Sequence, residues 1–267
     1  MKRKKRIGTA AKAVGCAVLL MISLFPIYWL LAMAIRPTDE MRGHIALIPQ
    51  SLTGMHFAQL FTSENFGQAI MNSLQTTFGS LIISLLAGIC AAYVIARRRF
   101  RFGLKKPMTY WVLLVRVLPP VAFTIPLYIM FNRLGVLNTK LPVMLACVLI
   151  NVPLIIWFLI SFFQDLPEEI EESAKVDGAT EWQLFRKIVL PLVAPGIAAV
   201  SMLSFMYAWN EYTYTVIFTR IPANNTVPLA LALLNTEDNL TNFGLVAAGG
   251  VISVIPITLF VIFAQNY

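Results

Sequence analysis

The sequence predicts an all-α membrane protein with six transmembrane helices, because it is strongly apolar overall and its apolar residues fall into six long stretches. Of the 267 residues, 58% are hydrophobic and only 13% are charged, with a mean hydropathy of +0.74. Soluble globular chains carry about 25% charged residues, so a soluble chain of this composition could not cover its own exterior. The composition also excludes a disordered chain and a collagen. The three cysteines lie far apart in apolar stretches and imply no disulfide framework.

Each of the six stretches approaches or exceeds the roughly 20 residues that a helix needs to cross a bilayer. They cover residues 13–35, 70–96, 107–131, 141–163, 188–210 and 243–264, and the third contains Arg116. The first follows a basic N-terminus, as the apolar core of a signal peptide would. Its 23 residues exceed the about 7–15 of such a core, so we interpret it as a retained transmembrane helix.

The basic residues are divided unequally between the two sides of the membrane. Fifteen Lys and Arg residues lie on one side, in the segment before the first stretch, between stretches two and three, and between stretches four and five. The connections on the other side contain five. Cytoplasmic loops are the ones enriched in Lys and Arg. The N-terminal segment 1–12 and the C-terminal segment 265–267 are therefore predicted to be cytoplasmic, and 36–69 and 217–242 to be external loops. The net charge of +8 then reflects topology and not nucleic-acid binding, which needs a folded basic surface with aromatic platforms.

Small residues recur at helical spacing in two of the stretches. Ser80, Ser84, Gly88 and Ala92 share one face of the second, and Gly244, Ala248, Gly249 and Gly250 are grouped in the sixth. Such faces let two helix backbones approach closely in lipid. They fit packing within this chain, which is the commoner case, or packing against a second membrane subunit.

The connection between stretches four and five, residues 164–191, predicts two short helices joined by a bend. Pro167 suits the first turn of a helix, and four glutamates follow it at the positive end of the helix dipole. Asp177 and Gly178 predict the break, since glycine adopts the left-handed turn without strain. Thr180 and Gln183 have the spacing of a capping box that opens a second helix.

Both short helices carry apolar side chains beyond the needs of a connector. Ile170 and Ala174 lie four residues apart on the first, and the second carries Trp182, Phe185, Ile188 and Val189. A helix pair resting on lipid headgroups is one explanation, but the anionic cytoplasmic leaflet would repel the acidic first helix. A groove on a partner protein is the better destination.

The same residues match a known motif. Glu172-Ser173-Ala174, Gly178 after three more residues, and Ile188-Val189-Leu190-Pro191 after nine more resemble the EAA loop of the membrane subunits of binding-protein-dependent ABC importers. The one departure is Ser173 in place of the first alanine. Segment 169–196 is similar to the carbohydrate-importer branch, and to its maltose-type six-span permeases in particular. Weaker resemblances from about Met71 onward are Arg116 with Pro119 and Pro120, the segment 135–139, the segment 209–212, Pro256 and the segment 265–267.

The resemblance implies the type I ABC importer permease fold, with residues 70–264 as the transmembrane domain and 164–191 as its cytoplasmic coupling loop. It implies a bacterial inner-membrane complex with a second permease subunit, two ABC ATPase subunits, an external solute-binding protein and a carbohydrate substrate. The chain would bind no cofactor and catalyse no reaction itself, because it lacks a G-x-x-x-x-G-K-[ST] sequence. ATP and Mg²⁺ would be bound by the partner ATPases.

The resemblance also assigns the residues that couple the chain to the ATPase. These are Glu171, Glu172, Ser173, Ala174, Asp177, Gly178 and Phe185. Among them, Glu172 would meet a basic residue of the ATPase, Ala174 would permit close contact, and Gly178 would set the bend.

Polar residues within the stretches are the candidates for the substrate path, since intramembrane charge is costly and often functional. The candidates are Arg116, Asn151, Tyr207, Asn210 and Glu211. Alternatively, Arg116 has a structural role and donates to backbone carbonyls that Pro119 and Pro120 leave without a hydrogen bond. Asn151 alternatively forms a hydrogen bond to a neighbouring helix. Aromatic and polar groups around Glu211 suit a sugar path, but they also fit an interfacial belt, with Glu211 reaching the headgroups.

Two other functional classes, a secondary transporter and an intramembrane enzyme, fit the sequence less well. A gradient-driven secondary transporter would carry titratable residues deep in its helices and often internal repeats, and it would not need the coupling loop. An intramembrane enzyme would need a nucleophile with its base or a metal site. His44 and His56 lack metal-ligand spacing, so we expect no metal.

Overall fold

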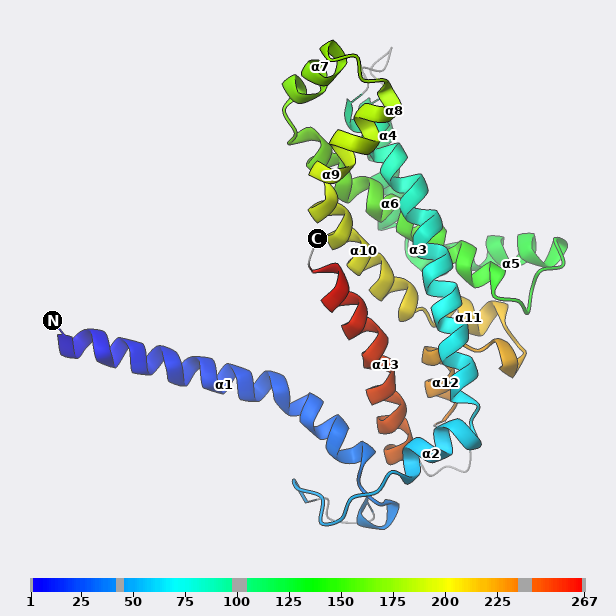
Figure 1. The fold of residues 1–267 in the computed structure, drawn as a ribbon. Coiled ribbons are helices and arrows are strands. Elements are labelled where there is room, and N and C mark those ends of the chain that lie inside the picture. The colour runs from blue at the N-terminus through cyan, green and yellow to red at the C-terminus, as the bar shows by residue number, and fades with distance from the viewer. Residues whose placement is uncertain (1, 42–45, 98–104, 235–241, 266–267) are drawn as a thin grey trace. The chain divides into compact units, whose positions relative to one another are not determined.

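The computed structural model describes residues 2–41, 46–97, 105–234 and 242–265, and all regular structure in these ranges is helical (Figure 1). The long helices are α1 (Lys2–Ala34), α3 (Phe66–Arg97), α4 (Lys105–Val117), α6 (Leu141–Gln164), α10 (Ala194–Trp209) and α13 (Phe243–Ala264). The shorter α-helices are α2 (Met55–Thr62), α5 (Thr124–Arg133), α7 (Glu168–Val176), α8 (Glu181–Leu184), α9 (Leu190–Leu192), α11 (Thr213–Phe218) and α12 (Val227–Leu233). Short 3-10 turns lie at η1 (Thr38–Met41), η3 (Pro120–Phe123) and η5 (Pro222–Asn224), and η4 (Phe185–Val189) is a π-helical turn.

Four of these helices are individually long and apolar enough to cross a membrane. They include residues Lys12–Ala34 of α1, and α3, α6 and α13 in full. The other two predicted spans are bent helix pairs, so the expected number of six holds within the described residues if each pair counts as one span.

The prediction of one continuous helix over 107–131 is wrong. Helix α4 ends at Val117, and the chain continues through η3 and α5 at 96° to it. Prolines lack the N–H group of the helical ladder and disfavour helical geometry in the residue before them. Pro119 accordingly has extended backbone angles, with φ −64° and ψ 136°.

The span predicted over 188–210 is also bent, by 72° between Glu181–Leu192 and α10. The break is at Val193, whose φ of −95° and ψ of 5° leave the helical region. Pro195 lacks the N–H that would bond to the carbonyl of Pro191 four residues back, so the ladder is interrupted at this point.

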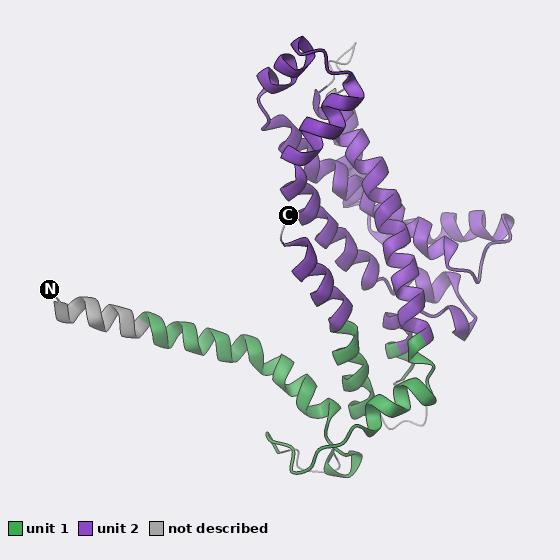
Figure 2. Ribbon diagram, in the orientation of Figure 1, with its two compact units in different colours: residues 1–67, 231–254 green, residues 68–230, 255–267 purple. Residues whose placement is uncertain are grey.

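The chain forms two compact units, each built from separate segments (Figure 2). Unit 1 contains residues 1–67 and 231–254, and unit 2 contains residues 68–230 and 255–267. The two units alternate along the chain. Both α3 and α13 begin in unit 1 and end in unit 2.

The predicted external loop 36–69 is more than a polar connection in unit 1. The Arg36 side chain is only 1% exposed, its Nη2 donates to the carbonyl of Ala46, and His56 Nε2 lies 2.9 Å from the carbonyl of Arg36. Glu40 accepts hydrogen bonds from the Ser51 hydroxyl and from backbone N–H groups, chiefly the former, which holds the pKa of its carboxyl below the ordinary value.

In unit 2 the small-residue face of α3 packs within this chain. Ser80, Ser84 and Ala92 are fully buried, and a Cβ added to Gly88 would lie 2.6 Å from the Ile155 side chain of α6. A Cβ added to Gly249 would similarly lie close to the side chains of Leu231 and Phe66 within unit 1. The observed contacts therefore favour packing within the chain over packing against a second subunit.

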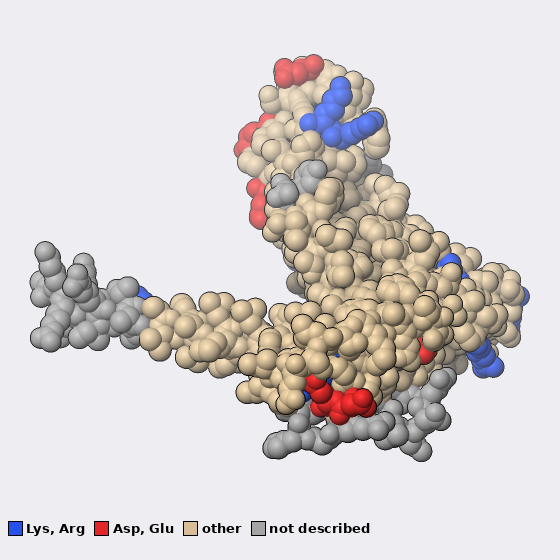
Figure 3. Space-filling model, turned by 60° about the horizontal axis from the view of Figure 1, so that its bottom comes forward, with Lys and Arg blue, Asp and Glu red and all other residues tan. Residues whose placement is uncertain are grey.

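Charged side chains are unevenly placed on unit 2. On the face drawn in Figure 3 they lie at the top, over α7 and α8, and at the right of the view, whereas the surface over the long helices carries few. Large apolar side chains are exposed along those helices, such as Leu86 at 67% and Leu259 at 62%. This is the distribution expected of helices in contact with lipid.

The contact of α6 with α10 in unit 2 yields the first prediction. A Cβ on the buried Gly196 would lie 2.6 to 2.9 Å from three ring atoms of Phe162. Gly196→Ala should therefore destabilise the protein by about 1–3 kcal/mol through overpacking, measured as a lower thermal unfolding temperature of the detergent-solubilised chain.

The matched control is Gly15→Ala in α1, where the added Cβ meets nothing within 4 Å. A second substitution, Phe162→Ala, should relieve the strain of Gly196→Ala. Equal unfolding temperatures for Gly196→Ala and the wild type would contradict the close approach.

Candidate functional site

The first helix of the coupling loop, α7, has the start and the end that the sequence predicts. It begins directly after Pro167 and carries Glu168, Glu169 and Glu171 in its first turn. It ends in a Schellman motif, in which the N–H of Gly178 donates to the carbonyl of Lys175 and that of Ala179 to the carbonyl of Ala174. The φ of Gly178 is +83°, so the bend needs a residue that tolerates left-handed geometry.

The second helix opens with the predicted capping box. Gln183 N donates to Thr180 Oγ1 at 3.3 Å, and Thr180 N donates to Gln183 Oε1 at 2.9 Å. After one turn, α8 passes into the π-helical turn η4 and then into α9. The predicted apolar face is divided, because Phe185 and Val189 are buried whereas Trp182 is 64% exposed.

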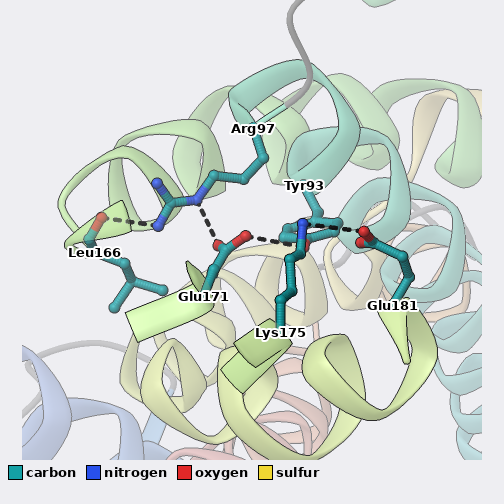
Figure 4. A network of polar contacts seen from close by, with 6 residues as sticks. All are labelled: Tyr93, Arg97, Leu166, Glu171, Lys175 and Glu181. Carbon is teal, nitrogen blue, oxygen red and sulfur yellow. Dashed lines mark hydrogen bonds and ion pairs between the residues drawn. The ribbon is translucent and has the colours of Figure 1, made fainter. Parts of the chain in front are cut away.

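A polar network ties the loop to the end of α3 (Figure 4). Arg97 Nε lies 2.8 Å from Glu171 Oε1, and Arg97 Nη2 donates to the carbonyl of Leu166 at 2.8 Å. The Tyr93 hydroxyl donates to Glu171 Oε2 at 3.4 Å. A second ion pair, Lys175 with Glu181 at 3.0 Å, joins α7 to α8 at the surface.

Apolar packing holds the same junction. The ring of Tyr93 lies 5.5 Å from that of Phe163 in α6 and 4.9 Å from that of Phe185, measured between ring centroids. Ala174 and Leu184 belong to the buried cluster that these rings extend. The loop is therefore fixed on the ends of α3 and α6 by side chains from five elements, α3, α6, α7, α8 and η4.

The predicted coupling residues divide into an exposed set and a set held by this chain. Glu172, Ser173, Asp177 and Gly178 are exposed. Ala174 is 7% and Phe185 8% exposed, and Glu171 is paired with Arg97. The small side chain of Ala174 thus permits close packing of α7 on its own chain.

Sequence reasoning missed Tyr93 and Arg97 as partners of the loop. Arg97 is the first residue of a basic run, which we assigned to membrane topology alone. Its position at the end of a helix of 32 residues, 74 positions before Glu171, gives no sequence signal of the pairing. The two residues also line a cleft of about 390 Å³ with Cys90, Val94 and Trp182 among its walls.

Two of the substrate-path candidates, Arg116 and Tyr207, line one cavity of about 200 Å³ in unit 2, together with Pro120 and Pro153. The Arg116 guanidinium lies 5.1 Å from the ring centroid of Trp157, in cation–π geometry. Among the described residues it donates no hydrogen bond to a carbonyl. The alternative of donation to freed backbone carbonyls is therefore not what the structure contains.

The other three candidates have structural partners within the chain. Asn151 is fully buried and its Nδ2 donates to the carbonyl of Ser204 at 3.3 Å, which joins α6 to α10. Asn210 is exposed, and its Nδ2 donates to the carbonyl of Met206 at 2.8 Å. The structure thus brings together Arg116 and Tyr207, and it shows Asn151 in the cross-helix bond that the sequence left as an alternative.

The Glu211 side chain is buried within this chain. It is 8% exposed, and Oε1 accepts a hydrogen bond from the backbone N–H of Tyr214 at 2.6 Å. The neighbouring Trp209 is 1% exposed, whereas Tyr212 is 42% exposed. Glu211 satisfies an N–H group in the first turn of α11, where the helix dipole favours a negative charge.

The described ranges contain no group of three or more His, Cys, Asp or Glu side chains arranged to hold a metal ion. Of the two histidines considered above, His56 is buried beside the carbonyl of Arg36, and His44 lies outside the described residues.

Comparison with known proteins identifies the family. The model of the binding-protein-dependent transport system inner membrane component matches residues 84–267. The chain belongs to this family. It is therefore a multi-pass inner-membrane permease subunit of an ABC importer that works with a binding protein, and the ATP is handled by a partner ATPase.

Curated relatives match over nearly the whole chain. The trehalose transport system permease protein SugB of Mycobacterium tuberculosis is 31% identical, covering 91% of this chain and 88% of the relative. The diacetylchitobiose uptake system permease protein DasC of Streptomyces coelicolor is 32% identical, covering 94% and 90%. The arabinooligosaccharides transport system permease protein AraQ of Halalkalibacterium halodurans is 31% identical, covering 100% and 96%.

Among solved structures, a chain of a bacterial ABC transporter involved in the import of the acidic polysaccharide alginate matches with a TM-score of 0.82. It is 20% identical, and the match covers 99% of this chain and 98% of that one. At this identity the likeness concerns the fold, and it agrees with the permease fold expected from the sequence.

The position of Glu211 yields the second prediction, which separates a capping role from contact with solute. Glu211→Ala leaves the buried N–H of Tyr214 without an acceptor and should lower stability by about 1–3 kcal/mol. Glu211→Gln keeps an acceptor oxygen and should unfold close to the wild-type temperature. Thermal unfolding of both variants is the measurement. A normal unfolding temperature with lost uptake in both would assign Glu211 to the solute path instead.

Proposed function

We propose that this chain forms the translocation path of an ATP-driven sugar import system together with a second permease subunit. The observation that carries the proposal is that three relatives at 31–32% identity, matched over nine-tenths of this chain or more, are named for the transport of trehalose, diacetylchitobiose and arabinooligosaccharides. The three named solutes differ in size and linkage but are all carbohydrates. The substrate class proposed here is therefore a di- or oligosaccharide delivered by an external binding protein.

The exposed side of α7 is the proposed contact with the ATPase. Glu172 and Ser173 are exposed on this helix, its last residue Val176 is 87% exposed, and Asp177 directly after it is exposed. An exposed helix with small and apolar side chains suits a groove on a partner protein. We assign two ATPase subunits to the complex, one for the coupling loop of each permease subunit.

The proposed orientation places both termini and the loop 164–191 in the cytoplasm and the loop 36–69 outside. This orientation is supported by the excess of Lys and Arg in the connections on the same side as the loop 164–191, because cytoplasmic loops are enriched in these residues. Residues 70–264 then form the transmembrane domain proposed from the sequence. The cavity beside Arg116 and Tyr207 is the proposed part of this domain that faces the solute, because it joins an aromatic hydroxyl to a charged donor.

The test of the function is reconstitution into liposomes. The chain, co-expressed with the neighbouring permease and ATPase genes, should take up labelled trehalose, diacetylchitobiose or an arabinooligosaccharide only when ATP and the binding protein are both present. Uptake by this chain alone, driven by an ion gradient, would favour the secondary transporter instead.

The third prediction concerns the coupling residues. Glu172→Lys reverses an exposed charge, and Gly178→Pro replaces the residue whose φ of +83° proline cannot adopt. Both variants should co-purify with at least about tenfold less ATPase, as expected when a contact worth about 1.4 kcal/mol or more is lost. Asp39→Lys is the control, because it makes the same charge change on an exposed residue of unit 1. Normal assembly and uptake in both loop variants would refute the docking assignment.

The fourth prediction concerns orientation. After replacement of Cys16, Cys90 and Cys147, single cysteines at Val176 and Leu52, which are 87% and 73% exposed, should react differently with a membrane-impermeant maleimide. In intact cells Leu52→Cys should be labelled and Val176→Cys should not, and opening the inner membrane should make both reactive. The reverse pattern would place the termini outside.

A further inference from the structure

The junction between α3 and the coupling loop contains a nearly buried ion pair between Arg97 and Glu171, and the resemblance assigns no role to its Arg97. The Arg97 and Glu171 side chains are only 9% and 14% exposed. Removing one partner of a buried pair leaves the other charge uncompensated, so the loss of either side chain should disrupt the junction. The pair Lys175 and Glu181, in contrast, is 49% and 71% exposed, and exposed pairs contribute little.

The position of Arg97 lets it fix α7 at two points. Helix α7 is connected to α6 only by the short turn 165–167, and to α8 only by the turn 177–180. Arg97 binds the carbonyl of Leu166 in the connection 165–167 and the carboxylate of Glu171 on α7 itself (Figure 4). The guanidinium can do this because its N–H donors have a rigid planar arrangement. Rotation of α7 about the turn would break one of the two contacts.

Tyr93 strengthens the same attachment from one turn earlier on α3. Its hydroxyl donates to the second oxygen of Glu171, and its ring packs on Phe163 and Phe185. The loop residues that face a partner, Glu172 and Ser173, directly follow Glu171. A force applied to the exposed side of α7 is therefore opposed, on its other side, by contacts to α3.

We propose that Arg97 is a positioning residue that clamps α7 to the end of α3, so that displacement of the coupling loop moves α3 with it. The inference rests on the proposed function, in which an ATPase displaces the loop. Without the clamp, α7 would turn about its two flanking turns, and ATP would be hydrolysed with little movement of the membrane helices.

The first test compares the solute transported per ATP hydrolysed in reconstituted complexes. Arg97→Lys keeps the charge, but a single ammonium group cannot hold both Glu171 and the carbonyl of Leu166 in the same geometry. We expect this ratio to fall by about fivefold or more, the lower end of couplings between distant sites, while the amount of bound ATPase is unchanged. Tyr93→Phe keeps the ring and should lower the ratio less.

Lys175→Ala is the matched control, since it breaks the exposed ion pair of the same loop and should leave the ratio unchanged. An unchanged ratio in Arg97→Lys would overturn the clamp. Loss of ATPase from the Arg97→Lys complex would also overturn it, because Arg97 would then act on docking. No ATP-dependent uptake by the wild-type complex would overturn the proposed function.

The second test measures the clamp without relying on transport. Spin labels at Leu86→Cys on α3 and Glu169→Cys on α7, both exposed and neither among the residues proposed to contact the ATPase, report the distance between the two helices in a background without the native cysteines. The wild-type distance should be a single narrow distribution that is the same with and without trapped ATP. Arg97→Lys should broaden it, and Lys175→Ala should not. A wild-type distance that changes with ATP, or a narrow distribution in Arg97→Lys, would overturn the proposal.

Discussion

The attachment of the loop 164–191 to the ends of α3 and α6 is the contact on which the proposed coupling to the ATPase depends. A transport subunit without its own nucleotide site must receive the work of a partner mechanically, so the receiving element has to be stiff. Here a nearly buried ion pair, a hydrogen bond to a carbonyl and aromatic rings in tilted and edge-on contact hold the loop. The exposed side of α7 is left free for a partner.

Lipid as the surrounding solvent explains most of the remaining architecture. Backbone groups in hydrocarbon must be paired within the chain, which leaves helices as the spanning elements. Proline can interrupt such helices where neighbouring groups pair the freed backbone. Two of the predicted spans are bent at prolines in this way, at Pro119–Pro120 and between Pro191 and Pro195. The first bend brings Pro120 and Arg116 to the wall of one cavity.

Polar residues within the predicted spans of unit 2 serve two different purposes. Asn151 and Glu211 bind backbone groups of this chain and stabilise its helices. Arg116 lies over the ring of Trp157 at the edge of a cavity and has no such backbone partner among the described residues. Intramembrane polarity alone therefore does not identify the solute path, and the partner of each group has to be known.

The sequence by itself determined the helical class, the approximate limits of the spans, the bend at Gly178 and the capping box of Thr180. These features depend on local backbone preferences and on hydrophobic length, which neighbouring residues encode. Only the tertiary structure decided that Ala174 packs inward, that Glu211 caps α11 and that Arg97 pairs with Glu171. Ala174 packs inward because the loop folds back on α3 and α6, and Arg97 meets Glu171 across 74 positions of sequence. Such pairings are set by how distant helices pack, a property that no local pattern contains.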